Sequence, residues 1–174
     1  MKPILVGLDG SELAERGLSL ATELAKGLDD KVIAARVVPP TWSAGGYDPE
    51  LRQRLEVADE AAAAGYLAKV ADRLRADSVK AETRLLHGDA WRALLAAAHQ
   101  DDCGLIVLTS HGLSGLASRV FGSVAQKVLA NASCPVVVVP CSDADLAREE
   151  ELEERASDEQ AVQRMSAVAK AKQR

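Results

Sequence analysis

A glycine-rich segment between two apolar runs contains the residues of this chain best suited to bind a ligand. The apolar run 105–108 ends in Thr109-Ser110-His111-Gly112, and Gly122-Ser123 follows after a spacer of nine residues. A helical pattern begins at this Gly-Ser step, where a helix presents unpaired backbone N–H groups and the positive end of its dipole. Glycine also lets a phosphate approach the backbone closely. The segment therefore predicts a nucleotide-phosphate site on an α/β sheet.

The same segment resembles the C-terminal half of the universal stress protein family, whose ATP-binding members carry Gly-x2-Gly-x9-Gly-Ser/Thr before their last helix. Gly112, the nine-residue spacer, Gly122 and Ser123 match this pattern, whereas Thr109 stands in place of the first glycine. The Thr109 side chain either crowds a ribose or triphosphate or donates a hydrogen bond through its hydroxyl. Leu113 occupies a place where many relatives carry a basic residue, so one phosphate-binding cation is missing.

The resemblance implies how ATP would bind. Backbone N–H groups of the glycine-rich segment and the Ser123 hydroxyl would hold the phosphates, Arg119 would reach the outer phosphates, and Thr109 would lie near the ribose. The adenosine would lie against the end of the first strand, near Asp9, and against the backbone of Val37. The expected nucleotide-binding residues are Gly7, Leu8, Asp9, Val37, Leu108, Thr109, Gly112, Arg119, Gly122, Ser123 and Val124.

These residues also have a purely structural interpretation. Glycines and aspartates such as Asp9 are common in the turns of any α/β protein, and Arg119 is typical of an exposed helix start. The segment contains neither GxxxxGK[ST] nor GxGxxG, so the spacing alone does not identify a nucleotide site. Two functions therefore stay open beside ATP binding: a nucleotide-independent interaction protein with a degenerate pocket, and a slow ATPase.

Catalytic and metal-binding patterns are not evident in the sequence. His99 and Cys103 are four residues apart, but they span a helix end and a strand start, and no second pair converges on them. No GxSxG elbow is present, and no general base or second basic cluster is placed for phosphoryl transfer. We therefore expect no metal site and no catalytic residue, and Mg²⁺ would be held mainly through the nucleotide.

Composition limits the classes of protein to which the chain can belong. Apolar residues make up 48% of the 174 residues but aromatic residues only 3%, so the core must be aliphatic. Because the net charge is −5, electrostatic attraction does not favour binding to nucleic acid or to an anionic membrane. No apolar run approaches the roughly 20 residues of a membrane-spanning helix, and no signal peptide is recognised. Three cysteines without CxxC spacing favour a reducing compartment, so we expect a cytoplasmic protein.

Strand and helix patterns alternate along the chain and predict a doubly wound, Rossmann-like α/β fold with a five-stranded parallel sheet. Ser11 and Asp89 are the expected N-caps of the first and third helices, and an apolar line from Leu51 to Leu74 is expected to pack the second helix. Strands are expected at 3–8, 31–38, 80–86, 105–108 and 136–139, and helices at 12–28, 49–76, 90–99 and 123–131. In such folds the ligand lies beyond the carboxyl ends of the strands, at the switch in strand order.

The chain changes character after Pro140. The resemblance covers residues 1–140, and residues 141–174 form a charged tail that is either frayed and partly helical or a helix that docks on the body or a partner. The strand Val136–Val139 is strongly β-prone and would be an aggregation hazard at a sheet edge. Related proteins commonly pair this strand with its copy, so we expect a homodimer. The most favoured function is a stress-response or regulatory protein that binds ATP and acts through its dimer or an unknown protein partner.

Overall fold

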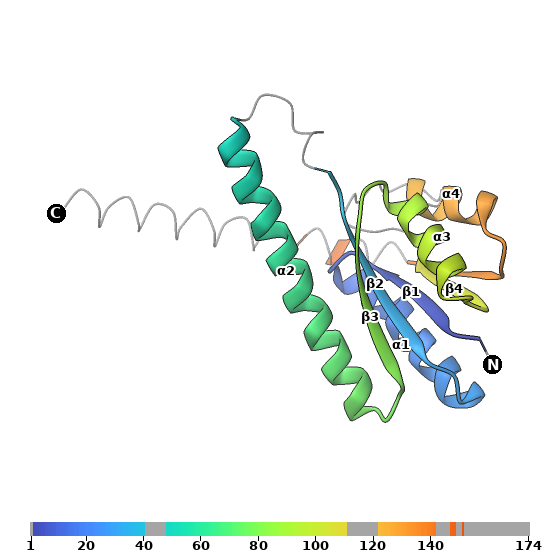
Figure 1. Cartoon of the computed structure of the whole chain (residues 1–174). Helices are drawn as coiled ribbons and strands as arrows, with labels where there is room; N and C mark the ends of the chain where they lie inside the picture. The colour runs from blue at the N-terminus through green and yellow to red at the C-terminus, as the bar shows by residue number, and fades with distance from the viewer. Residues whose placement is uncertain (1, 41–47, 111–121, 142–146, 149–150, 152–174) are drawn as a thin grey trace.

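The computed structural model describes residues 2–40, 48–110, 122–141, 147, 148 and 151. Strands and helices alternate through this part of the chain (Figure 1). Every predicted strand and helix is present, with ends within one residue of those expected from the sequence. The elements are β1 (Ile4–Leu8), α1 (Glu12–Leu28), β2 (Val32–Val38), α2 (Pro49–Ala76), β3 (Ala81–His87), α3 (Ala90–Gln100), β4 (Leu105–Thr109), α4 (Ser123–Asn131) and β5 (Val136–Val139).

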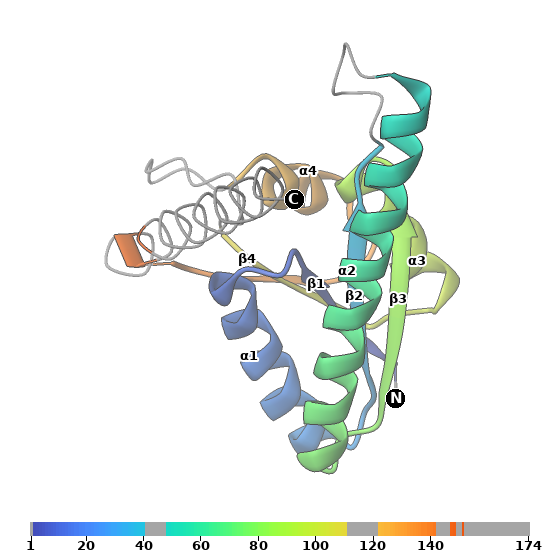
Figure 2. The same cartoon turned by 90° about the vertical axis from the view of Figure 1, so that its left-hand side faces the viewer.

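The strands form one parallel sheet in the order β3-β2-β1-β4-β5. The chain winds outward from β1 through β2 to β3, then returns to the centre and continues through β4 to β5. The direction of winding therefore switches between β1 and β4, which are hydrogen-bonded neighbours. Helices α1 and α2 cover one face of the sheet and α3 and α4 the other (Figure 2). This is the doubly wound fold that the sequence predicts.

Alternating side chains of the strands fill two aliphatic cores. On β1, Val6 points to the α1 and α2 layer, whereas its neighbour Leu5 points to the α3 and α4 layer, and both are fully buried. Strands buried on both faces explain why these segments are continuously apolar rather than alternating. The expected aliphatic core is confirmed, since the largest fully buried side chains are Ile, Leu and Val.

Both predicted N-cap residues are confirmed, but only Ser11 makes a capping hydrogen bond with its side chain. The Ser11 hydroxyl accepts a 3.1 Å hydrogen bond from the Ala14 N–H and so caps α1. Asp89 lies at the N-cap position of α3 but makes no capping hydrogen bond. Its carboxylate instead accepts a 3.0 Å bond from Trp91 Nε1 and lies 3.8 Å from Arg92 Nε. Asp89 is thus the N-cap residue that the sequence predicts, but its carboxylate contacts the indole and the guanidinium rather than the helix backbone.

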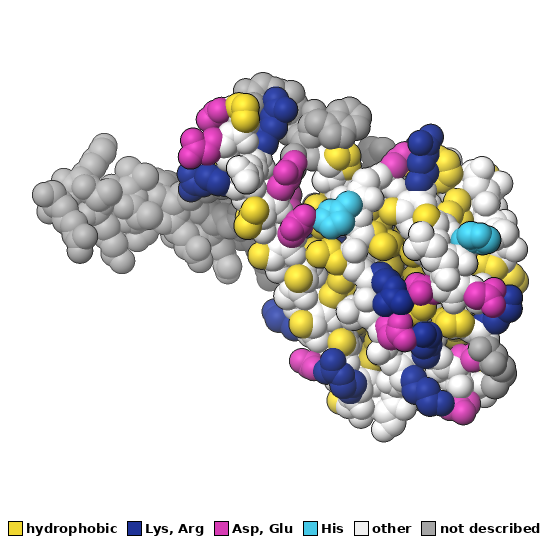
Figure 3. All heavy atoms as spheres, in the orientation of Figure 1, with side chains coloured by type: hydrophobic (Ala, Val, Ile, Leu, Met, Phe, Trp, Pro, Cys, Tyr) yellow, Lys and Arg dark blue, Asp and Glu magenta, His cyan; other side chains and the backbone are white. Residues whose placement is uncertain are grey.

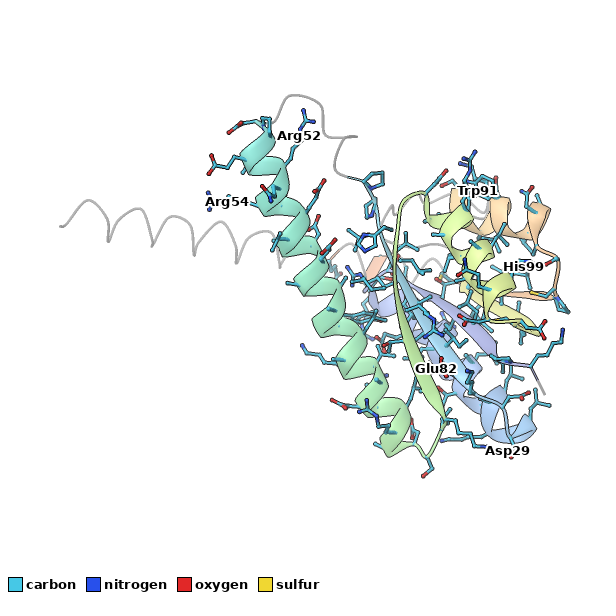
Figure 4. All side chains as sticks on the ribbon, in the orientation of Figure 1. Asp29, Arg52, Arg54, Glu82, Trp91 and His99 are labelled. Atoms are coloured by element: carbon cyan, nitrogen blue, oxygen red, sulfur yellow. The ribbon has the colours of Figure 1, made fainter. Side chains whose placement is uncertain are left out.

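The apolar line along α2 is buried only in its C-terminal half. Leu67, Val70 and Leu74 pack against the sheet, but Leu51 and Leu55 are 40% and 39% exposed. A helix of 28 residues is about 42 Å long, whereas a strand of seven residues spans about 23 Å. The first half of α2 therefore extends beyond the sheet (Figure 1), and Figure 4 labels Arg52 and Arg54 on this projecting half.

Charged side chains lie along the edge strand β3. Arg84 Nη2 lies 2.9 Å from both Glu82 Oε2 and Asp101 Oδ1, and Lys31 Nζ lies 2.6 Å from Glu82 Oε1. The space-filling view shows positive and negative side chains interspersed on the face that it presents (Figure 3). Charges on an edge strand oppose pairing with another chain, so this edge is protected.

Candidate functional site

A cavity of about 280 Å³ opens at the carboxyl ends of β1 and β4, where the strand order switches. Its wall is largely apolar, and hydroxyls, one carboxylate and the start of α4 supply the polar groups among the described residues. The cavity is lined by Gly7, Leu8, Asp9, Ala14, Val37, Ala90, Leu94, Leu108, Thr109, Ser110, Gly122, Ser123, Val124 and Ala125. This is the place where open α/β sheets bind ligands.

The structure brings most of the expected nucleotide-binding residues together in this one wall. Nine of the eleven line the cavity: Gly7, Leu8, Asp9, Val37, Leu108, Thr109, Gly122, Ser123 and Val124. The other two, Gly112 and Arg119, lie outside the described residues, as does Leu113. The contact of each residue with a nucleotide stays a prediction, but their shared location follows from the sheet topology.

Sequence reasoning missed five lining residues: Ala14, Ala90, Leu94, Ser110 and Ala125. Ala14, Ala90 and Leu94 come from α1 and α3, whose apolar positions look the same whether they face a core or a cavity. Ala125 follows the expected pair Ser123-Val124 by one residue. Ser110 lies inside the glycine-rich segment itself, so its position in that segment was the available signal.

The N-terminus of α4 forms the polar part of the wall. Gly122 is the N-cap, and the first backbone bond of the helix runs from the Gln126 N–H to the Gly122 carbonyl, at 3.0 Å. The N–H groups of Ser123, Val124 and Ala125 precede that bond and have no carbonyl partner within the helix. Glycine has no side chain that could cap them. An anion in the cavity would meet these donors and the positive end of the helix dipole.

The Gly122 N–H itself is already used. It donates a 2.7 Å hydrogen bond to the carbonyl oxygen of Ser110. That this N–H holds a phosphate stays a prediction, and a phosphate there would have to compete with the Ser110 carbonyl for this donor. The spacing of glycines could not reveal this bond, which depends on how the end of β4 meets the start of α4.

Asp9 is the one carboxylate among the described lining residues. Its Oδ1 accepts hydrogen bonds from the Ser11 N–H at 3.0 Å and from the Ser11 hydroxyl at 2.6 Å. This pair holds the turn after β1 in place and connects Asp9 to the cap of α1. The structural interpretation of Asp9 as a turn residue is thus correct, and the residue also faces the cavity.

Thr109 presents its methyl group to α1. A β-carbon built on Gly17 of α1 would lie 3.5 Å from Thr109 Cγ2. The methyl group therefore lies on the α1 side of the sheet, whereas α4 lies on the other side. Thr109 stands where the family pattern has a glycine, and the sequence leaves open whether its side chain crowds the nucleotide or donates a hydrogen bond. This geometry does not support crowding of the phosphates by the methyl group.

Neither a metal centre nor a membrane span is found in the part of the chain that the structure describes. No group of three or more His, Cys, Asp or Glu side chains is arranged there to hold an ion. None of the described helices has the length and apolar character required to cross a bilayer.

These features define a doubly wound α/β protein with a cavity at the switch in strand order. The chain belongs to the universal stress protein family, whose model matches residues 1–140. A universal stress protein of Thermus aquaticus is 30% identical over 141 residues, which are 79% of this chain and 98% of that protein. The universal stress protein YxiE of Bacillus subtilis is 31% identical over 144 residues, 78% of this chain and 97% of that protein.

Solved structures of the family share the fold. The universal stress protein UspA of Lactobacillus plantarum superposes with a TM-score of 0.71 at 22% identity and covers 79% of this chain and 97% of its own. A universal stress protein in complex with cAMP gives a TM-score of 0.62 at 26% identity, covering 81% of this chain and 98% of its own. A universal stress protein from Archaeoglobus fulgidus in complex with dAMP gives a TM-score of 0.58 at 24% identity. The match covers 80% of this chain and 98% of that protein.

Proposed function

We propose that this chain is a cytoplasmic regulatory protein of the stress response that binds ATP in the cavity between β1 and β4, with little or no turnover. The observation that carries the proposal is the convergence of an apolar slot and an uncapped helix N-terminus in one cavity. The apolar slot suits a base and a ribose, and the helix N-terminus suits a phosphate. The related protein at 26% identity that is in complex with cAMP binds an adenine nucleotide, which supports the same ligand class here.

The size and charge of the cavity fit a nucleotide in a particular orientation. A volume of about 280 Å³ lies just below the range of small-molecule sites, which span roughly 300–1,000 Å³. The nucleoside and first phosphate would fill it, and the outer phosphates would extend past the start of α4. Asp9 would repel phosphate, so the phosphates lie toward Ser123 and the nucleoside toward Asp9. Mg²⁺ would be held through the nucleotide, because Asp9 Oδ1 is engaged by Ser11.

Little or no hydrolysis is expected from the groups around the cavity. A phosphoryl transfer requires a group that positions the attacking water and cations that neutralise the developing charge. Asp9 is the sole titratable side chain in the described wall, and it is held by Ser11. We therefore infer a protein that senses ATP by binding it.

Two substitutions at Ser123 test the proposal. Proline is favoured at the first position of a helix, and Gly122 has φ −55° and ψ 155°, which a residue preceding proline adopts readily. Ser123→Pro therefore keeps α4 but removes one N–H donor and the hydroxyl, whereas Ser123→Ala removes only the hydroxyl. We expect Mg-ATP at 100 times its Kd to stabilise the wild type by about 2.7 kcal/mol, or roughly 5–10 °C.

The three proteins are compared by thermal unfolding with and without Mg-ATP, and ATP binding is measured by calorimetry. The expected order of affinity is wild type, then Ser123→Ala, then Ser123→Pro. Equal affinity of the wild type and Ser123→Pro would contradict a phosphate site at α4. No shift of the wild type at millimolar ATP would exclude the nucleotide function itself.

We further propose a homodimer that forms through β5. This strand is at the edge of the sheet, and its four valines are only partly buried. The carbonyls of Pro135 and Val139 accept hydrogen bonds from the N–H groups of Ile106 and Ser110, on the side of β4. The N–H groups of the alternate residues Val136 and Val138 therefore point to the open edge of the sheet. Val138→Pro removes one such donor without breaking the bonds to β4, and it should convert a dimer to a monomer in sedimentation experiments. A dimer that persists in Val138→Pro uses another surface.

One observation favours the alternative of a nucleotide-independent interaction protein. Three of the five large apolar side chains that are exposed in the described residues lie within the first half of α2: Leu51, Leu55 and Val57. Leu51 and Leu55 are one turn apart and share one side of α2, whereas Val57 lies on nearly the opposite side. Exposed apolar side chains of this kind suit contact with another protein. This function predicts that stress phenotypes depend on residues 49–62 or on the tail 141–174, and that they persist in a Ser123→Pro protein that no longer binds ATP.

A further inference from the structure

The indole of Trp91 contacts two cations that come from different helices. Trp91 is in the first turn of α3 (Figure 4), and Arg92 Cζ lies 5.0 Å from the centroid of its ring. Lys127 of α4 places its Nζ 5.9 Å from the same centroid. The ring is itself fixed, because its Nε1 donates a 3.0 Å hydrogen bond to Asp89 Oδ2. The half-buried indole therefore holds a lysine of α4 beside the start of α3.

This cluster lies next to the cavity. Ala90 and Leu94, which line the cavity, are the residues one before and three after Trp91 in α3. Ser123, which also lines the cavity, precedes Lys127 by about one turn of α4, so the two side chains share one face of that helix. Side chains of a helix lean toward its N-terminus. The Lys127 side chain therefore extends from the second turn of α4 in the direction of Ser123.

The cluster carries an excess of positive charge. It holds two cations, Arg92 and Lys127, and one carboxylate, Asp89. Asp89 Oδ2 lies 3.8 Å from Arg92 Nε, whereas Lys127 makes no ion pair with any of the described residues. An aromatic face attracts an ammonium group without taking up its three N–H donors. Those donors therefore stay available to an anion.

A phosphate close to Ser123 would compete successfully with the ring for the Lys127 ammonium. The contact with the ring is weak, since Lys127 is exposed and its Nζ lies near the limit of about 6 Å for such contacts. A hydrogen bond between an ammonium and a phosphate joins two charged groups and is among the strong ones. The rise from Ser123 to Lys127 is about 6 Å, which a lysine side chain can span.

We propose that Lys127 binds the outer phosphates of the nucleotide and so makes the cavity prefer ATP to AMP. The inference rests on the proposed function, because it requires a nucleotide whose first phosphate lies at the start of α4. The single phosphate of AMP would stay at the N–H groups of the helix, whereas the outer phosphates of ATP extend far enough to meet Lys127. Trp91 is a positioning residue that keeps the ammonium near the site while the cavity is empty.

Affinities for ATP, ADP and AMP provide the first test, measured by calorimetry on the full chain in the presence of Mg²⁺. Lys127→Gln keeps a long polar side chain but removes the charge, so the affinity for ATP should fall about tenfold while that for AMP stays unchanged. Lys127→Arg should retain the preference for ATP. Lys69→Gln is the matched control, because Lys69 is an exposed lysine of α2, on the other face of the sheet. It changes the net charge equally and should leave every affinity unchanged.

The fluorescence of Trp91 provides a second readout, which a merely structural role of Lys127 would not affect. The chain has two tryptophans, so Trp42→Phe leaves Trp91 as the single indole. When Lys127 turns from the ring to the phosphates, the cation leaves the indole and the emission of Trp91 should change. Saturating ATP should therefore change the emission, whereas saturating AMP should not. When Lys127→Gln is added to Trp42→Phe, ATP should no longer have this effect.

The outcomes distinguish the inference from the function on which it rests. If ATP binds but no more tightly than AMP, or if Lys127→Gln alters the two affinities equally, the inference is overturned and the nucleotide site stands. An equal loss of ATP affinity in Lys69→Gln would reveal a general effect of net charge and would overturn it too. So would a Trp91 emission that responds to AMP as it does to ATP. If neither nucleotide binds, the inference and the proposed function are both overturned.

Discussion

Gly7 in β1 lies against the side chain of Leu108 in β4 so closely that a β-carbon on Gly7 would be 2.5 Å from Leu108 Cδ2. The same β-carbon would lie 3.3 Å from Leu94 Cδ1 of α3. All three residues line the cavity. Gly7 is thus required by packing on the cavity side of the sheet, where two neighbouring strands and a helix meet.

Gly7→Ala should destabilise the protein and narrow the cavity. The leucines must leave their preferred rotamers to admit the methyl group, and overpacking of this kind costs about 1–3 kcal/mol. Urea denaturation measures the loss, and calorimetry should show weaker ATP binding in the fraction that is folded. An alanine variant as stable as the wild type would mean that the leucines rearrange freely.

Gly65→Ala serves as the matched control and should have the opposite effect. Gly65 lies within α2, and nothing lies within 4 Å of the place where its β-carbon would be. Alanine is favoured over glycine in a helix interior by roughly 0.5–1 kcal/mol. The urea midpoint should therefore rise with no change in ATP affinity. A fall in stability, or loss of an oligomer, would reveal a close neighbour of Gly65 in an assembly.

Thr109→Gly restores the residue that the family pattern has at this position. Because the Thr109 methyl group packs over Gly17, we expect the glycine variant to lose about 1 kcal/mol of stability and to gain no ATP affinity. Thr109→Ser isolates the contribution of the methyl group. A tenfold gain in affinity, about 1.4 kcal/mol, would show that Thr109 crowds the nucleotide and would favour the degenerate-pocket alternative.

Tyr66 should make the protein less stable in alkaline solution. Burial, chiefly, and the 2.9 Å hydrogen bond to Glu15 Oε1 raise the pKa of its phenol above the ordinary value. Between the ordinary pKa of about 10 and the raised value, the unfolded chain loses a proton that the folded chain keeps. Stability must therefore fall as the pH rises through this interval.

Tyr66→Phe provides the comparison for this prediction. Near neutral pH the variant should be less stable by about 1 kcal/mol, because it lacks the hydrogen bond to Glu15. The difference from the wild type should shrink above pH about 10. The chain has two tyrosines, so Tyr47→Phe leaves Tyr66 as the one phenol and its absorbance reports the pKa directly. A titration near the ordinary value would contradict the prediction.

The sequence was sufficient to predict the elements, the sheet and most of the cavity wall. Strong apolar runs such as 105–108 and the Gly122-Ser123 step specify local structure, and the topology then brings their ends together. What the sequence could not supply depends on partners distant in the chain. The Asp89 carboxylate is taken by an indole, and the Gly122 N–H is taken by the Ser110 carbonyl. Which partner forms such a hydrogen bond depends on the three-dimensional positions of the groups. The spacing of residues in the sequence does not reveal it.

The projecting half of α2 has a consequence for how that helix forms. Residues 49–62 make no buried contact with the sheet, and an isolated helix shorter than about 12–15 residues is marginal in water. The packed turns around Leu67 and Val70 supply the nucleus, and the helix then propagates outward from it toward Pro49. Opening should therefore begin at Pro49 and advance inward on warming, so amide protection should rise steadily from the free end to the packed turns.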